Sequence, residues 1–475
     1  MRKNITIKKI SAWFILLLIC MLFGTTSDVA TYISILLSVL CASVIAESFT
    51  KCPSVGVPKG IVVMLVLQNF IIGVGAHAAG NSGNGLKFLT QIPFLSIAVI
   101  WAMLQLKMKK LHRNRNLPQR WFHLLLCCIA LSALIGRGSV QAILVNIRNL
   151  TVFFMAFEIG QYSLQNASSF HEFERFLLKI GLIVLVVGII ILISGYPLYK
   201  AIGIKEVYIA KNAPILKDAL DDRFHTTLYK TEYTRMGSLY YEPVNLAYLY
   251  AEIFLVAWFG GWTHSVSRRV FYILISGVGL VLTFGKGGYM IVGAVFLCIY
   301  GQKLYRFLMR RLSKKTVKKL TISTLIVVLT AFCIFYYIYV GAAARPHFEG
   351  IIRTWASVLR KPIGYGLGTG GNAAQSFGAK MDWLSSGGET ALMSFMYQLG
   401  IQGVLVFAIC LTSTHIDFKN NDFRMIMYCY LPFILLGISL LQDNTYTPQC
   451  IVPFMLLQGG AKKLTYENTH HNWAC

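Results

Sequence analysis

The sequence predicts an all-α integral membrane protein. Its 475 residues are 56% hydrophobic and only 13% charged, whereas about 25% of the residues in an ordinary soluble domain are charged. Apolar runs that approach the roughly 20 residues a helix needs to cross a bilayer recur along the chain. We therefore expect 12 to 14 transmembrane helices, with the lipid bilayer as the first partner.

The apolar runs place the spans and divide the chain. We expect helices near residues 11–24, 29–46, 60–77, 88–106, 121–136, 147–164, 176–195, 243–260, 270–284, 287–300, 319–341, 390–411, 424–441 and 446–460. The divisions are an N-terminal bundle (1–195), a first long loop (196–242), central helices (243–341), a second long loop with the catalytic residues (342–389), C-terminal helices (390–460) and a tail (461–475).

The positive charges predict the orientation. Most of the 44 lysine and arginine residues fall between spans on one side if the N-terminus is cytoplasmic, as the positive-inside rule requires. Both long loops are then extracytoplasmic, and the chain is expected in the cytoplasmic membrane. The formal net charge of +25 is explained by anionic headgroups, so no nucleic acid is expected as a partner.

The cysteines and histidines do not indicate a metal site or a disulfide framework. The eleven cysteines are scattered without C-x-x-C spacing, and the ten histidines lack metal-ligand spacing. We expect no metal and no cofactor.

The stretch "RKPIGYGLGTGG" in the second long loop contains G-x-G-x-x-G at Gly366, Gly368 and Gly371. A dinucleotide site needs a strand before this turn and a helix after it, and no strand pattern precedes it here. The glycines are better explained as a tight turn that lets backbone approach a ligand or re-enter the membrane surface.

Cations around this turn predict a diphosphate site. If residues 349–360 are helical, Arg353 and Arg360 share one face, and Pro362 ends the helix. Guanidinium groups bind phosphate oxygens through a fixed fork. Arg235 lies before a span that opens at Pro243, and Lys286 lies between glycines in "GKGG"; solvated loop charges and snorkelling to headgroups are the plainer alternatives.

A carboxylate near these cations could serve as a general base. Glu389, at the head of a span, is the first candidate, and His347 and Asp382 are the next. Glu389 would also suit a helix N-terminus, where its role would be a cap. Trp355 and Tyr241 could stack on sugar rings or anchor the chain at the membrane interface.

These motifs, over residues 230–405, resemble the bacterial O-antigen polymerase and O-antigen ligase superfamily of membrane glycosyltransferases. Three motifs support the resemblance. The first is "RMGSLYYEPVNLAYL" with Arg235, Gly237, Pro243 and Asn245, and the second is the hairpin "GKGGY" with Lys286 in place of the family's arginine. The third is the run Arg353, Trp355, Pro362, Gly364 or Gly366, and Gly368. The family's ligases have a His where this chain has Glu389, followed by a frame that fits Thr390, Gly400 and Gly403.

The resemblance implies a GT-C-like architecture and a metal-independent polymerase of undecaprenyl-pyrophosphate-linked oligosaccharide repeat units. O-antigen, capsule and exopolysaccharide remain open as products, and a flippase and a chain-length regulator are implied as further partners. Glu389 in place of His favours polymerisation over ligation to an acceptor. The alternative from another class is a lipid-linked oligosaccharide transporter, whose charged residues would line a path through the helices.

Overall fold

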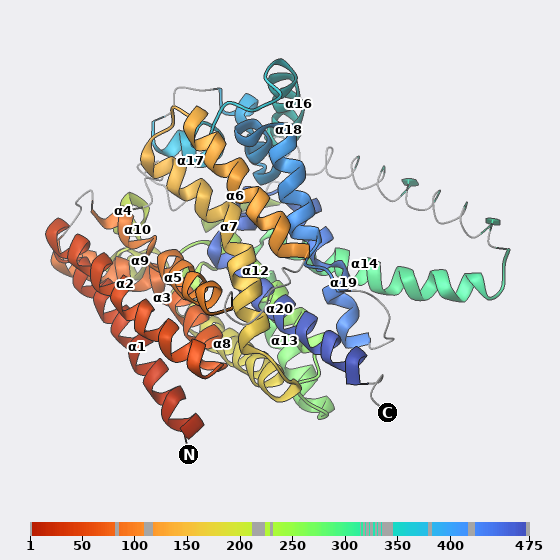
Figure 1. Cartoon of the computed structure of the whole chain (residues 1–475), viewed down its shortest axis with the longest axis horizontal. Helices are drawn as coiled ribbons and strands as arrows, with labels where there is room; N and C mark the ends of the chain where they lie inside the picture. The colour runs from red at the N-terminus through yellow and green to blue at the C-terminus, as the bar shows by residue number, and fades with distance from the viewer. Residues whose placement is uncertain are drawn as a thin grey trace.

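The computed structural model is a bundle of long helices with a small β-hairpin (Figure 1). It describes residues 2–80, 85–108, 117–210, 224–228, 231–313, 345–378, 382–416 and 423–471, with eight scattered positions between 314 and 344. The predicted span at 319–341 therefore lies largely outside the described residues. Each of the other predicted spans coincides with a helix.

The elements follow the chain in this order: α1 (Arg2–Gly24), α2 (Asp28–Lys51), α3 (Gly56–Ala79), α4 (Leu86–Leu89), α5 (Ile92–Met108), α6 (Leu117–Ile135), α7 (Val140–Ser163), α8 (Ala167–Ser194), α9 (Tyr196–Ala201), α10 (Ile204–Ala210), β1 (His225–Leu228), β2 (Thr231–Thr234), η1 (Ser238–Tyr240), α12 (Pro243–Phe259), α13 (Val266–Thr283), α14 (Lys286–Met309), α16 (Arg345–Arg360), α17 (Gly371–Ser376), η3 (Leu384–Ser386), α18 (Ala391–Thr412), α19 (Phe423–Ile438), η4 (Asp443–Tyr446) and α20 (Pro448–His471).

Eight of the described helices are long and apolar enough to cross a membrane, namely α2, α3, α6, α7, α8, α13, α14 and α18. Four shorter apolar helical stretches lie in α1, α5, α12 and α19. The chain therefore has the composition of a multi-pass membrane protein. Large apolar side chains such as Leu134 and Ile193 are more than 80% exposed on the bundle surface, where lipid would cover them.

Glycines allow the central helices to pack closely. A Cβ on Gly160 of α7 would lie 2.2 Å from the Leu456 carbonyl oxygen of α20, and a Cβ on Gly459 of α20 would lie 2.0 Å from the Phe157 carbonyl oxygen of α7. Small residues are enriched at membrane helix crossings for this reason. These two helices cross in the middle of the bundle (Figure 1).

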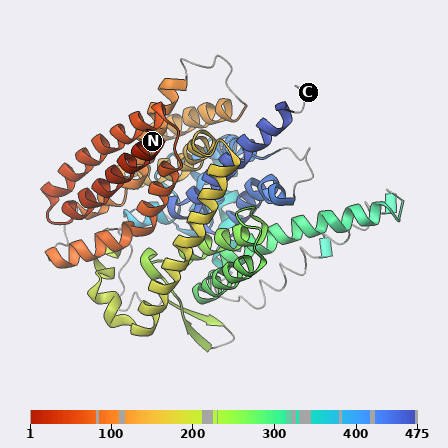
Figure 2. The same cartoon turned by 90° about the horizontal axis from the view of Figure 1, so that it is seen from below.

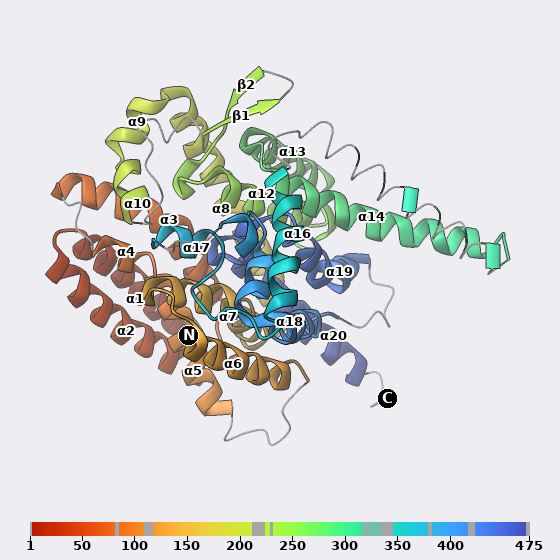
Figure 3. The same ribbon diagram turned by 90° about the horizontal axis from the view of Figure 1, so that it is seen from above.

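The two ends of the bundle differ. In Figure 1 α16 and α17 lie at the upper end, α4 and α10 lie at the upper left, and both termini lie toward the lower end. Seen from above, α16 lies across the end of the bundle next to α18 (Figure 3). From below, α14 extends away from the other helices and the β-hairpin projects from the edge (Figure 2).

The hairpin is a feature that the all-α prediction lacks. Strands β1 and β2 pair antiparallel with His225 opposite Thr234. Threonine occupies four of their eight positions, and β-branched residues favour strands. The pairing is too short for hydropathy to reveal it.

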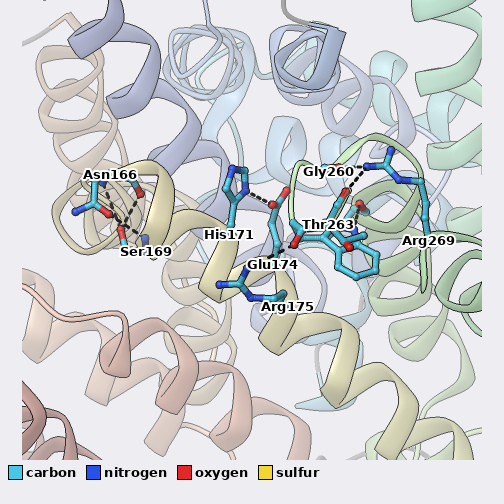
Figure 4. A network of polar contacts seen from close by, with 10 residues as sticks. Asn166, Ser169, His171, Glu174, Arg175, Gly260, Thr263 and Arg269 are labelled. Atoms are coloured by element: carbon cyan, nitrogen blue, oxygen red, sulfur yellow. Dashed lines mark hydrogen bonds and ion pairs between the residues drawn. The ribbon is translucent and has the colours of Figure 1, made fainter. Parts of the chain in front are cut away.

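At the lower end, a polar network joins the start of α8 to the turn between α12 and α13 (Figure 4). His171 lies 2.6 Å from the buried Glu174. Arg269 donates to the carbonyl oxygens of Gly260 and Thr263 at 2.9 and 3.1 Å. Arg175 of α8 donates to the Trp262 carbonyl oxygen of the same turn at 3.4 Å. The two arginines thus satisfy backbone oxygens in the turn and connect α8 and α13 to it.

Candidate functional site

The polar groups at the upper end converge on Glu389. This residue follows Gly387 and Gly388, whose positive φ angles of 121° and 54° turn the chain sharply before α18. Helix α18 begins at Ala391 with Thr390 as its N-cap, so Glu389 stands outside the helix and does not occupy the cap position. Its side chain is 43% exposed.

Helix α16 brings His347 to Glu389. The buried face of α16 includes His347, Gly350 and Thr354, and Gly350 lies against the Gly387–Gly388 backbone. His347 Nε2 is 3.0 Å from Glu389 Oε2. Burial lowers the pKa of His347, against an opposing effect of the Glu389 carboxylate. The imidazole is therefore largely neutral at pH 7 and can exchange a proton with its neighbour.

Lys286 approaches the same acid from a different part of the chain, and Arg235 lies beside Lys286. Met236 donates its backbone N–H to Leu282 at 2.8 Å, and Arg235 Nε donates to the Thr283 carbonyl oxygen at 3.0 Å. These bonds hold Arg235 beside the hairpin that begins α14. Lys286, the first residue of α14, interacts electrostatically with both Arg235 and Glu389.

The glycines around Lys286 fix this hairpin on α12. A Cβ on Gly285 would lie 2.1 Å from the Ala247 Cβ, and one on Gly288 would lie 2.6 Å from the Ala247 carbonyl oxygen. Larger residues would push the hairpin away from α12, and Lys286 with it.

Arg353 and Asp382 form a neighbouring pair. Arg353 lies 3.1 Å from Glu349 and 3.6 Å from Asp382. It is six residues beyond His347 on α16, about 9 Å along the helix axis. The Ser385 hydroxyl holds the pKa of Asp382 below its usual range, so this carboxylate is a weak base. Arg360 is exposed at the C-terminal end of α16, which ends before Pro362 as predicted.

Asp443 is a part of the site that the sequence did not predict. The Asn372 side chain donates to the Asp443 carboxylate at 2.8 Å, and the Trp383 indole N–H donates to the Asn372 side-chain oxygen at 2.7 Å. Burial raises the pKa of Asp443 to about 6, and the Glu389 carboxylate adds to this rise. The sequence could have indicated Asp443, because it is a lone acid in a short turn between two predicted spans. That turn lies on the same side as the long loops.

The remaining predicted residues are placed differently. Tyr241 is fully buried, and its hydroxyl donates to the Ile202 carbonyl oxygen at 2.7 Å, so it supports the first loop from within. Trp355 is 43% exposed on α16 and is accessible to a ligand or to lipid.

The glycine turn packs against protein backbone. Gly364, Gly366 and Gly368 all have positive φ. A Cβ on Gly366 would lie 2.2 Å from the Gly136 Cα, and Gly368 lies against Gly138. These contacts account for glycine at both positions, while the predicted substrate contact stays a prediction.

The N–H groups of this turn are also occupied. Gly366 donates to the Gln398 carbonyl oxygen at 3.1 Å, Leu367 to Ser132 at 2.9 Å and Gly368 to the Gln398 side chain at 2.7 Å. A phosphate-binding turn needs such groups free. The turn therefore does not have the arrangement of a dinucleotide loop.

No family model matches the chain, and neither the curated proteins nor the solved structures contain a match. The candidate site consists of Arg235, Lys286, His347, Glu389 and Asp443, each from a different element or turn, with Arg353 and Asp382 beside them.

Proposed function

We propose that this protein is a metal-independent glycosyltransferase that polymerises undecaprenyl-pyrophosphate-linked repeat units at the outer face of the cytoplasmic membrane. The observation that carries the proposal is the His347–Glu389 pair at 3.0 Å with Lys286 near both residues, and with Arg235, held by its bond to Thr283, beside Lys286. A transferase with a lipid-pyrophosphate donor needs both a fixed cation cluster and a base.

The reaction divides into two tasks. An acceptor hydroxyl loses its proton to Glu389, and its oxygen forms a bond to the anomeric carbon of the donor. The bond from that carbon to the pyrophosphate oxygen breaks, and the pyrophosphate leaves with the electron pair. Arg235 and Lys286 stabilise its developing charge. Arg353 lies further along α16, whereas Arg360, at the end of that helix, lies about 20 Å from His347 along the helix axis and is not brought into the cluster.

The His347–Glu389 contact suits a positioned base. Glu389 is accessible enough to meet a hydroxyl, and the neutral His347 at 3.0 Å donates its Nε2–H to the carboxylate and orients it. Asp382 is the weaker candidate because its pKa is lowered.

The test is to incubate the purified full chain with a lipid-linked repeat unit and separate the products by length. We expect a ladder of longer glycans, and Glu389→Gln should slow its formation by about 10²- to 10⁴-fold, the usual contribution of a general base. The matched control is Glu232→Gln, which changes an exposed acid on β2 and should leave the rate unchanged.

The same experiment separates the alternatives. A ligase would add glycan once to a separate acceptor and form no ladder. A transporter would move the lipid-linked unit across vesicles without lengthening it. Either result, or equal rates in Glu389→Gln and Glu232→Gln, would contradict the proposal.

A further inference from the structure

A cavity of about 240 Å³ with both polar and apolar walls lies beside the site and has no role in the mechanism above. Its walls come from α3, α4, α5, α7, α10, α12, α17, η4 and α20. Asn372 and Asp443 belong both to this cavity and to the polar groups near Glu389, so the two spaces adjoin.

The lining has the chemistry of a carbohydrate site. Eight lining residues carry side-chain amides, among them Gln91, Asn149, Asn245 and Asn372. Each amide has two N–H donors. Asn245 donates one to Gln449 and Asn372 donates one to Asp443, so within the described residues the second N–H of each is left for a sugar hydroxyl group. The volume is below the roughly 300–1,000 Å³ of sites for drug-sized ligands, so it suits a group the size of one sugar ring.

Arg148 gives the cavity a specific charge. Its guanidinium donates to the amide oxygens of Asn149 at 3.1 Å and Gln91 at 3.2 Å. Within the described part of the chain, no carboxylate lies within ion-pair distance of it. Arginine has five N–H donors, so others remain for a ligand. Lys87 is a second cation in the lining.

We propose that this cavity binds a carboxylate-bearing sugar of the acceptor glycan, with Arg148 holding the carboxylate. The inference rests on the proposed function, since it names the acceptor of that same site. A guanidinium and a carboxylate form two parallel hydrogen bonds, and the amides bind the hydroxyl groups of the ring. A hydroxyl of this sugar then faces Asp443 and the neighbouring Glu389.

The acids in the lining favour a carboxylate over a phosphate. Glu242 and Asp443 also line the cavity, and their charges oppose a dianion more strongly than a monoanion.

The test measures binding to the full chain in detergent, by saturation-transfer NMR, of 4-nitrophenyl β-D-glucuronide and 4-nitrophenyl β-D-glucoside. We expect the glucuronide to bind at least about tenfold more tightly, as hydrogen bonds to charged groups imply. Arg148→Gln should remove this preference. Arg268→Gln, which removes an exposed cation at the other end of the bundle, should retain it.

A second readout does not depend on any variant. Hydrogen exchange of the wild-type chain should slow at residues 85–92 and 140–149 with the glucuronide and not with its methyl ester. Equal binding of both glycosides, or displacement of the glucuronide by an equal concentration of inorganic phosphate, would overturn the inference. Because neither measurement needs polymerisation, a missing product ladder would count against the proposed function alone.

Discussion

At the residue scale, the neighbouring acids Glu389 and Asp443 have different surroundings. Glu389 is 43% exposed beside His347, so it can meet a substrate. Asp443 is enclosed by α17 and the turn before α20, and Asn372 donates to it at 2.8 Å. Its pKa of about 6 means that part of its population is protonated near neutral pH. Proton uptake by Asp443 lowers the negative charge next to Glu389.

The raised pKa of Asp443 gives stability a definite pH dependence. The unfolded chain ionises this group near 3.8 and the folded chain near 6, so the folded state binds more protons between these values. Stability therefore falls as pH rises through this window. Asp443→Asn should raise the melting temperature relative to the wild type at pH 8 and not at pH 4. A pKa shift of this size corresponds to about 3 kcal/mol in the free energy of unfolding. Because solvent screens the charge, we expect a measured difference of about 1–2 kcal/mol.

Asp382→Asn is the matched control for this measurement. The pKa of Asp382 is lowered, so its ionised form stabilises the folded state above its ordinary pKa, and that stabilisation is lost on acidification. The variant should show a small loss of stability at pH 8. The account would be wrong if Asp443→Asn changed the melting temperature equally at pH 4 and pH 8.

Residue type and position relative to the predicted spans pointed to several members of the candidate site. Glu389, His347, Arg235 and Lys286 were predicted because charge is rare in an apolar chain and collects on the side of the long loops. Asp443 was missed because its turn is short. Tyr241 was proposed as a stacking residue, but its burial depends on packing against Ile202 and Tyr199, which no local pattern reveals.

At the element scale, the loop around the glycine turn is held by backbone contacts with the ends of other helices. Ile401 donates to the Pro362 carbonyl oxygen at 3.1 Å, where α18 is broken at Gly400 with φ 75°. The turn therefore fits between α6 and the break in α18, and this anchors the C-terminal end of α16. Helix α16 was predicted from residue 349 and begins at Arg345, one turn earlier, so that His347 is helical.

Gly366→Ala should destabilise the protein through this packing. A positive φ costs about 1–3 kcal/mol for a residue other than glycine, and the clash with Gly136 adds about 1–3 kcal/mol. Gly378→Ala is the control, because φ is 82° there but nothing lies within 4 Å of the added Cβ. Thermal unfolding should show a larger loss for Gly366→Ala, and equal losses would mean that the turn does not pack as described.

At the scale of the whole molecule, a bundle of apolar helices has the polar groups of the candidate site at one end. The helical class and the helix positions follow from composition, because apolar runs in a bilayer have few alternatives to helix. Helix contacts such as that of α7 with α20 depend on which faces meet, and sequence periodicity does not specify that for helices apolar on all sides. The contact between Arg235 and the hairpin before α14 likewise depends on which helix faces meet, so the sequence does not specify it.

The central claim is that the cation cluster at this end binds a lipid diphosphate. It is tested most directly by measuring the affinity of undecaprenyl pyrophosphate and undecaprenyl phosphate for the protein in nanodiscs. The wild type should bind the pyrophosphate more tightly, and Lys286→Gln should weaken that binding by about tenfold or more, while Arg268→Gln at the opposite end leaves it unchanged. Equal affinity for the two lipids, or equal weakening by both substitutions, would contradict the claim.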